Sequence, residues 1–469
     1  MFVKMLIVAE LAWPSFVGLC SRGAGSLLAL LLLAACSSST DLTSGAITIS
    51  TGQESDAWTT EPAPQSVLIE MVQNTRTTLA KVPAPATTVS IGTDGPSSAV
   101  ASFEATAFDA DSNPVMHASS VPLYVQGFAG AEIVLFMGRI GGLSRAPGDL
   151  LFPRQHPKLA VFYHGYLLIS GGDGAQTNEP ALDIYDMARW SVTPEQTPLP
   201  KVPKSWAVAE PDLLLIDDTG ALWLDTSTGA TSAPVAPAAF DFADVVGGQT
   251  IVAPDDTQYI VGGTRVAGEP TGSVLRIDTD GTLHAMKLVA PRLGASAAIV
   301  GGQLLVVGGS GTGAGAEVSN AAGTGFTPLP FPPDATLGAA LVAKDSTTVV
   351  LAGGRDPASD AISGFRTMDL GCAQDCAQIA IADADFAFDH PQLFALNAGQ
   401  LLAVGESTTG ETHVFTFDTE IGHALSEIAL RTPRAGASAF MLPNGQVGVF
   451  GGTALADDSA VSSIELFFP

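Results

Sequence analysis

Pairs of adjacent glycines recur along the last two thirds of the chain at a nearly constant interval. From one pair to the next the interval is 91, 46, 45 and 98 residues, so two intervals are single steps and two are close to double steps. The two missing members are recognisable, because Asp217-Asp218 and Gly405-Glu406 end apolar runs of the same kind. A period of this length is typical of solenoids, propellers and related arrays, and we expect seven copies of one unit. The pairs begin at Gly171, Gly262, Gly308, Gly353 and Gly451.

The repeating unit consists of short β-strands. Residues 291–297 (PRLGASA) and 433–439 (PRAGASA) open two of the copies almost identically. Each opening leads into a small-residue strand, a turn, and a second apolar strand that ends in the glycine pair, before a third strand and a short fourth segment. No long stretch has the 3.6-residue amphipathic period of a surface helix, so the sequence predicts an all-β fold.

Four short strands per repeat, with a glycine pair after the second, resemble the kelch repeat over about residues 151–469. Tyr185, Asp186 and Trp190 match the end of the kelch pattern, although most copies lack the tryptophan and two lack the double glycine. The resemblance implies a seven-bladed β-propeller with one four-stranded blade per repeat, rather than a six-bladed or open arrangement. The last copy stops at its third strand, so we expect residues 131–140 to supply the missing strand and close the ring.

Two further segments are expected before the propeller, which would span residues 131–469. Residues 66–130 contain about six short runs rich in Val, Ile, Thr and Phe, separated by turns such as Thr93-Asp94-Gly95. This pattern predicts a small antiparallel β-sandwich that resembles the Ig-like or fibronectin-like domains of bacterial surface proteins. Residues 36–65 are rich in Ser, Thr, Gly and Pro and lack apolar periodicity, so we expect a flexible tether there.

Residues 1–35 have the pattern of a lipoprotein signal peptide. An apolar run that is too short to span a bilayer comfortably, SLLALLLLAA, ends in Leu33-Ala34-Ala35-Cys36. This ending resembles the bacterial lipobox, in which the cysteine is lipidated, so Cys36 is the predicted lipid anchor. An ordinary signal peptide or a buried cysteine is the alternative. Ser37 after the cysteine resembles the sorting pattern for the outer membrane of Gram-negative bacteria, and the lipid is the only membrane contact that we expect.

Cys372 and Cys376 are the remaining cysteines of the mature chain. In an exported protein the oxidising compartment favours a local disulfide between them, with two free thiols as the alternative. They lie in an insertion between the fifth and sixth copies, where a disulfide would restrain a long loop. Only His390 follows nearby, so a metal site built on these cysteines is not expected.

One position of the repeat is basic in several copies. His156, Arg292, His390 and Arg434 lie 15 to 17 residues before the glycine position of their copies. The kelch resemblance implies that this region borders one mouth of the central channel. A ring of His and Arg side chains there would bind an anionic ligand or a carboxylate-bearing peptide. The alternative is structural, with each basic side chain bonded to neighbouring carbonyl groups or to an acidic strand end.

Charge and motifs narrow the choice of function. The formal net charge of −27 disfavours nucleic acid as a partner, because an acidic surface repels phosphate groups. Copper-radical oxidases also use a kelch-like propeller, but here Tyr163-His164 lies in a hairpin turn and no cysteine is left for the crosslink that such a site needs.

We therefore predict a non-catalytic binding or scaffold protein of the cell envelope, which recognises a protein or glycan partner through its propeller loops. No cofactor and no bound metal are expected. The alternative is a propeller enzyme, either oxidase-like or glycan-active, with its site at the propeller mouth.

Overall fold

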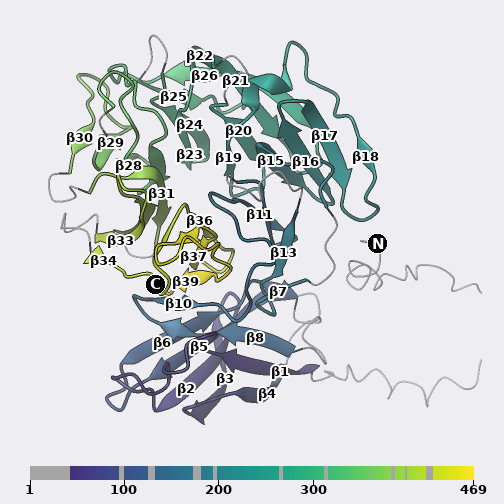
Figure 1. Ribbon diagram of the computed structural model, residues 1–469, viewed down its shortest axis with the longest axis vertical. Coiled ribbons are helices and arrows are strands. Elements are labelled where there is room, and N and C mark those ends of the chain that lie inside the picture. Colours follow the sequence, from purple (N-terminus) through teal and green to yellow (C-terminus); the bar gives the residue numbers. More distant parts are fainter. Residues whose placement is uncertain are drawn as a thin grey trace, which may run out of the picture.

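The computed structural model describes residues 43–93, 100–124, 132–172, 181–193, 198–263, 268–310, 315–360, 362–381, 386–396, 399–418 and 426–469 (Figure 1). Their regular structure is almost entirely β, which confirms the all-β prediction. A short 3-10 helix, η3 (Phe242–Val245), precedes β19 (Gln249–Val252). Among the described residues, no helix has the length and apolar character needed to cross a membrane.

The N-terminal part consists of two sheets that pack on a common core. Its strands are β1 (Thr43–Ser50), β2 (Ser66–Val72), β3 (Arg76–Pro83), β4 (Thr88–Thr93), β5 (Val100–Phe108), β6 (Pro114–Ser119), β7 (Leu123–Tyr124), β8 (Glu132–Phe136) and β9 (Gly138–Arg139). The smaller sheet has the order β4-β1-β8, with β8 parallel to β1, and the larger has the order β3-β2-β5-β6-β9, with β7 paired to β5. Every second residue of β5 is buried, because one face of this strand points into the shared core.

The predicted boundary between a tether and a folded domain is wrong. β1 lies inside the segment 36–65 that was expected to be a flexible tether, and it pairs with both β4 and β8. Its sequence, TSGAITIS, is dominated by small and hydroxyl residues, yet Ile47 and Ile49 are buried in the core. Two isoleucines at alternate positions were too weak a period to identify a strand.

The strands found within the segment expected to close the ring, residues 131–140, belong to the N-terminal sheets instead. β8 pairs with β1, and β9 pairs with β6. The closure prediction for this segment is therefore wrong. Its apolar pattern fits a buried strand in either place, because periodicity reports burial and not the partner strand.

Seven four-stranded antiparallel sheets follow, here called sheets 1 to 7. Sheets 1 to 3 contain β11 (Lys158–Phe162), β12 (Tyr166–Ser170), β13 (Asp183–Asp186) and β14 (Ser191–Val192); β15 (Ser205–Ala209), β16 (Asp212–Asp217), β17 (Gly220–Asp225) and β18 (Thr231–Ser232); and β19, β20 (Gln258–Val261), β21 (Thr271–Ile277) and β22 (Leu283–Arg292). Within each of them the strands pair in sequence order.

Sheets 4 to 6 repeat this order with β23 (Ser296–Val300), β24 (Gln303–Val307), β25 (Ala316–Ser319) and β26 (Phe326–Pro328); β27 (Ala340–Ala343), β28 (Thr348–Ala352), β29 (Arg366–Asp369) and β30 (Ile379–Ala380); and β31 (Asp389–Ala395), β32 (Gln400–Glu406), β33 (Thr412–Asp418) and β34 (Ser426–Glu427). Sheet 7 contains β36 (Ser438–Met441), β37 (Val447–Phe450), β39 (Glu465–Phe467) and β10 (Leu143–Arg145). Beside it, β35 (Arg434–Ala435) pairs with β38 (Thr453–Ala454).

Sheet 7 is completed by a strand from much earlier in the chain. β10 lies antiparallel to β39, with Leu143 opposite Phe467. The last copy of the repeat thus receives its fourth strand from the segment that directly follows the N-terminal sheets. A strand from before the first copy was expected to complete the last copy, and β10 is such a strand. It lies a few residues after the segment that was predicted, residues 131–140.

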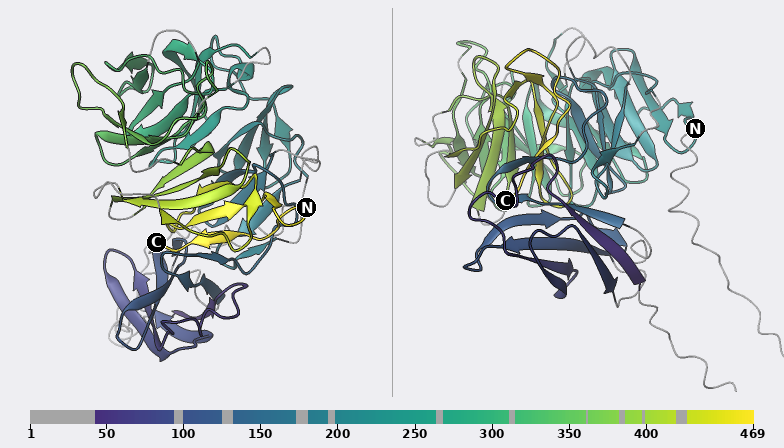
Figure 2. Two further views of the ribbon diagram at one scale, coloured as in Figure 1. Left: turned by 60° about the vertical axis from the view of Figure 1, so that its left-hand side comes forward. Right: turned by 60° about the horizontal axis from the view of Figure 1, so that its bottom comes forward.

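Each sheet packs on its neighbours through both faces. In β24, Leu304 and Val306 pack with sheet 3, whereas Leu305 and Val307 pack with sheet 5. Every pair of consecutive sheets shares an apolar cluster of this kind. A further cluster joins sheet 7 to sheet 1, and the views in Figures 1 and 2 show the sheets following one another around the molecule. Central strands are apolar at consecutive positions because both of their faces are covered.

The glycine pairs lie where consecutive sheets come closest. A Cβ atom at Gly451 of sheet 7 would lie 2.2 Å from the carbonyl oxygen of Arg154, which leads into sheet 1. At Gly353 of sheet 5 it would lie 2.4 Å from the carbonyl oxygen of Phe388, which leads into sheet 6. Both glycines also have a positive φ, 68° and 62°. The period seen in the sequence therefore marks backbone contacts between sheets.

The N-terminal sheets attach to sheets 1 and 7. Trp190 of sheet 1 donates from Nε1 to the carbonyl oxygen of Val134 in β8, at 3.0 Å. Asn444, in the hairpin of sheet 7, donates from Nδ2 to the carbonyl oxygen of Ser119 at 2.8 Å. Phe136 of β8 enters the cluster that joins these two sheets. The N-terminal part therefore packs on the sheets that the chain's first and last copies form.

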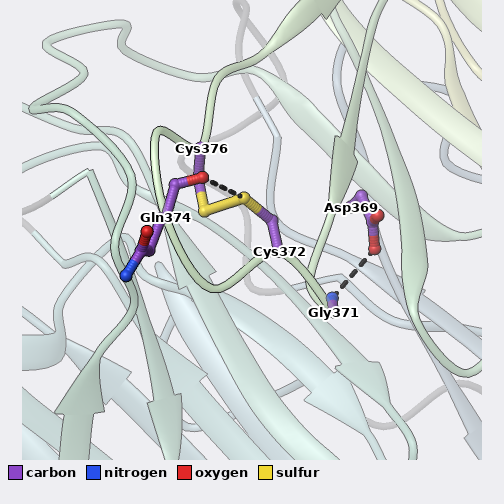
Figure 3. The surroundings of a disulfide bond; sticks show 5 residues. All are labelled: Asp369, Gly371, Cys372, Gln374 and Cys376. Atoms are coloured by element: carbon purple, nitrogen blue, oxygen red, sulfur yellow. Dashed lines mark hydrogen bonds between the residues drawn. A yellow bond between two sulfur atoms is a disulfide. The ribbon is translucent and has the colours of Figure 1, made fainter.

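Cys372 and Cys376 form the disulfide that the sequence predicts, in the loop after β29 (Figure 3). Gly371 donates its N–H to Asp369 Oδ1 at 2.9 Å, and the carbonyl oxygen of Gln374 lies 3.2 Å from Cys372 Sγ. Cys376 is buried in the cluster between sheets 4 and 5. The disulfide thus restrains the loop locally, and Cys376 packs the loop against sheets 4 and 5.

Candidate functional site

Arg292, the last residue of β22, joins the outer strand of sheet 3 to sheet 4. Its Nη2 lies 2.6 Å from Oε1 of Glu317, and its Nη1 donates to the carbonyl oxygen of Gly308 at 3.0 Å. Glu317 also accepts the backbone N–H groups of Val289 and Ala290. Both charged side chains are almost completely buried. The ion pair therefore holds the end of β22 in sheet 3 to the end of β24 and to β25 in sheet 4, which supports the structural alternative for Arg292.

Sheet 7 contains the same arrangement around Arg434. Its Nη2 forms an ion pair with Glu465, and its Nη1 donates to the carbonyl oxygen of Gly451 at 3.2 Å. Glu465 accepts the backbone N–H groups of Arg431 and Thr432 at 2.7 and 2.9 Å. Neither Arg434 nor Glu465 is exposed to solvent. Arg434 thus forms the same kind of buried ion pair as Arg292.

Sheet 1 has Arg154 at this place, so the sequence alignment of the basic position was partly wrong. Arg154 Nη1 donates to the carbonyl oxygen of Gly171 at 3.4 Å. Asp183 accepts the two backbone N–H groups that precede this arginine by two and three residues, at 3.1 Å each. The counterpart of the two other arginines is therefore Arg154, and His156 occupies a different position, two residues later.

His156 and His390 share that second position, which favours glycine. The backbone is left-handed at both histidines, with φ of 44°. The backbone N–H of His156 donates to the carbonyl oxygen of Gly436 at 2.7 Å. In the same way the N–H of Gly338 donates to the carbonyl oxygen of Gly294 at 2.8 Å, so these residues occupy equivalent positions in their sheets. These three glycines have φ of 62° to 70°. Left-handed backbone is costly for residues with a Cβ atom, so histidine is an unexpected residue type here.

The two histidines meet although they belong to sheets 1 and 6. Their ring centroids lie 4.9 Å apart, with the ring planes tilted by 35°. The intervening sheet 7 has Gly436 at the same position, and a glycine brings no side chain between the rings. The site therefore depends on the return of the last copies of the repeat to the first.

Glu406, the last residue of β32, contacts both rings. Its Oε1 lies 2.7 Å from Nε2 of His156, and its Oε2 lies 3.3 Å from Nδ1 of His390. The Glu406 side chain is 9% exposed, whereas those of His156 and His390 are 28% and 63% exposed. The carboxylate thus forms the floor of the cluster, and the cluster opens to solvent beside His390.

Two of the three groups, Glu406 and His390, have shifted pKa values. Burial by itself would raise the pKa of Glu406, but the hydrogen bonds and positive charge of His156 and His390 hold that pKa at about 2. The hydrogen bond with Glu406 raises the pKa of His390, against the effect of burial. Near neutral pH the cluster therefore contains an ionised carboxylate beside two imidazole rings.

Further charged groups extend the cluster toward sheet 5. Arg355, which follows the glycine pair of that sheet, forms ion pairs with Asp389 and with Asp360, the latter at 3.0 Å. Asp389 Oδ1 also lies 3.9 Å from Nδ1 of His390. The polar surface around the histidines thus spans loops from sheets 5, 6 and 1.

Two imidazoles and a carboxylate form a donor set suited to a divalent metal ion, and the ligand atoms of His156, His390 and Glu406 lie within 4.8 Å of one another. Both histidines were among the predicted ligand-binding residues, whereas Glu406 was predicted only as a substituted member of a glycine pair. A usable signal was present in the sequence. The sixth copy replaces glycine twice, by His390 and by Glu406, and both replacements point to one place.

The chain matches no protein-family model and no curated protein. Its function is therefore inferred from the sequence pattern and from this site. The predicted lipid anchor, Cys36, lies outside the described residues.

Proposed function

We propose that sheets 1 to 7 are the blades of a seven-bladed, kelch-type β-propeller and that the N-terminal sheets are an Ig-like or fibronectin-like domain. The apolar clusters between consecutive sheets, including the one between sheet 7 and sheet 1, support this architecture. The strand that β10 adds beside β39 supports it as well, because a closed ring of blades needs no exposed edge at its last blade.

We infer that this propeller is a non-catalytic binding or scaffold module on the cell envelope, anchored by a lipid on Cys36 and exposed at the outer membrane of a Gram-negative bacterium. Its partner is a protein or a glycan, held by loops at the end of the propeller where the glycine pairs lie. One observation carries this proposal. The residues that recur between blades, such as Arg292 and Arg434, are buried and bonded internally, whereas the loops after the glycine pairs differ from blade to blade.

The alternative function, a propeller enzyme, has one observation in its favour. His156, His390 and Glu406 form a partly exposed cluster in which the pKa of the carboxylate is strongly lowered. Clusters of perturbed titratable groups are common at catalytic centres, although ion-pair networks with a structural role show them too. The cluster identifies no substrate, so binding remains the first proposal.

Site-specific crosslinking in intact cells tests the binding proposal. A photoreactive amino acid is placed at Ala358, which is exposed in the loop after the glycine pair of sheet 5, and in a matched variant at Ser346, which is exposed in the hairpin at the opposite end of the same sheet. We expect a discrete crosslinked species from position 358 and none from position 346. Equal crosslinking from both positions, or none from either, would count against recognition through these loops.

The anchor is tested separately. Cys36→Ala should abolish incorporation of labelled fatty acid and release the protein from the membrane fraction, whereas Cys372→Ala should leave both unchanged. Membrane association that survives Cys36→Ala would contradict the lipid anchor without bearing on the propeller or its partner.

A further inference from the structure

We propose that His156, His390 and Glu406 together bind one divalent transition-metal ion of the zinc type. The inference goes beyond the proposed binding function and does not depend on it. It rests on the geometry of the three side chains, on where their residues lie in the repeat, and on the exposure of the cluster.

The geometry needs only small side-chain movements to accept a metal. Around tetrahedral zinc, ligand atoms about 2.0–2.2 Å from the ion lie roughly 3.3–3.5 Å from one another. In the structure the ligand atoms of the three residues lie within 4.8 Å of one another, and Glu406 contacts the rings of His156 and His390 at 2.7 and 3.3 Å. His390 is the most exposed of the three, so its ring is free to rotate toward the ion.

The donor set also matches the chemistry of zinc. Two imidazole nitrogens and one carboxylate oxygen are a known ligand combination for sites that leave a fourth position open. The opening beside His390 gives solvent or another ligand access to that fourth position. Asp389, which is paired with Arg355, adds a second carboxylate beside the ligand set, with Oδ1 3.9 Å from Nδ1 of His390.

The repeat supplies the strongest argument. At the left-handed position where other sheets have Gly294, Gly338 and Gly436, two sheets have histidine, and those two histidines are in ring contact. At the second residue of the glycine pair, the sheet that carries His390 has Glu406. Three residues that depart from the repeat pattern thus converge on one point. A structural role in a single blade would not explain this convergence, whereas a ligand shared by the three side chains does.

A hydrogen-bonded cluster without metal is the competing explanation, and variants that restore the repeat's own residue separate the two. His390→Gly and His156→Gly place glycine where the backbone favours it, so they keep the fold while removing one ligand each. His284→Gln serves as the matched control, because His284 is also an exposed histidine beside a carboxylate, at 3.0 Å from Asp278, but lacks a second histidine.

The experiment titrates the full chain, purified without a polyhistidine tag and stripped with a chelator, with zinc chloride in a calorimeter. Thermal melting with and without zinc is recorded for every variant. We expect one zinc ion per chain for the native protein and for His284→Gln, with a melting midpoint that rises in zinc. His156→Gly and His390→Gly should each lower the affinity at least about tenfold, and the zinc-dependent rise in the midpoint should disappear.

Two results would overturn the proposal. One is a native protein that takes up no zinc, or binds it no better than His390→Gly does. The other is a loss of binding in His284→Gln as large as in the two glycine variants, which would place the ion elsewhere. Because the melting midpoint without zinc reports folding independently, a variant that fails to fold is recognised as such, and Glu406→Gln then provides the second ligand-removing variant.

Discussion

Arg292 and Glu317 form an ion pair that the protein encloses almost completely, with Nη2 2.6 Å from Oε1 and side chains that are 2% and 0% exposed. The carboxylate also accepts two backbone N–H groups of the strand that carries the arginine. Removal of one partner leaves the other charge buried without compensation, which is far more costly than the loss of a surface pair.

Arg292→Met should therefore lower the free energy of unfolding by about 3–5 kcal/mol, measured by urea denaturation. Arg189→Gln is the control, because Arg189 pairs with Asp186 at 2.9 Å but is 65% exposed. The control should change stability by less than about 1 kcal/mol. Similar small effects from both variants would show that the buried pair does not hold sheet 3 to sheet 4.

Gly451 and Gly445 separate two reasons for glycine in sheet 7. Both have a positive φ, 68° and 81°, but a Cβ atom at Gly451 would lie 2.2 Å from the Arg154 carbonyl oxygen, whereas one at Gly445 would have nothing within 4 Å. We expect Gly445→Ala to cost about 1 kcal/mol from backbone strain alone. Gly451→Ala should cost about 3 kcal/mol or more, because the contact between sheets 7 and 1 must also open. Equal costs in thermal melting would contradict a steric role for the glycine pair.

These two cases show why the sheets could be predicted from sequence and the site only in part. The glycine pairs recur because, at the five junctions where they lie, the first glycine packs against the backbone that leads into the next sheet, so a local cause repeats with a fixed period. The count of seven sheets followed from that period. The strand that completes sheet 7 did not, because residues 132–136 (EIVLF) form an apolar run whereas residues 143–145 (LSR) do not, so the apolar pattern pointed to the wrong strand.

The candidate site was harder to predict than the sheets, because its residues lie far apart in the sequence. Spacing aligned His156 and His390 with Arg292 and Arg434. In the structure the two histidines lie two residues after the arginine position, in an exposed cluster, whereas the two arginines form buried ion pairs. The shift becomes clear only from Arg154, whose side chain makes in sheet 1 the bond to the glycine pair that Arg292 and Arg434 make elsewhere. Contact between a residue of the first copy and two of the sixth depends on how the last sheets pack against the first, which no local pattern encodes.

The left-handed backbone at His390 gives a prediction that needs no ligand. In the presence of chelator, His390→Gly and His390→Ala remove the same imidazole, so a difference between them reports the backbone alone. With φ of 44°, alanine retains the conformational penalty and glycine does not. We expect His390→Gly to be more stable than His390→Ala by about 1 kcal/mol in thermal or urea denaturation. The reverse order would mean that the backbone at this position is not left-handed in solution.

The disulfide between Cys372 and Cys376 should stabilise the fold only modestly. It closes a loop with a sequence separation of 4, and a small loop loses little entropy when it is closed. Replacement of both cysteines by alanine should lower the free energy of unfolding by about 2 kcal/mol at most. Hydrogen exchange should increase in the loop after β29 and remain unchanged in sheet 1. A global loss of protection would indicate that Cys376 matters chiefly as a core residue between sheets 4 and 5.

Glu54 gives a pH-dependent test of how the N-terminal sheets are held. Burial would raise the pKa of Glu54, but hydrogen bonds and charge from Arg145 lower it below its ordinary value of 4.5. A carboxyl whose pKa is lower in the folded state stabilises the fold at pH values above its unfolded pKa, and it loses that contribution as the pH falls.

Glu54→Gln should therefore be less stable than the native protein by about 1 kcal/mol at pH 7, a small effect because Arg145 remains about a third exposed. The difference should shrink as the pH falls below 4.5, when urea denaturation is repeated at pH 7, 5, 4 and 3. Glu61→Gln, at an exposed position of the same segment, should match the native protein throughout. A difference that stays constant over this pH range would mean that the ion pair with Arg145 does not form in solution.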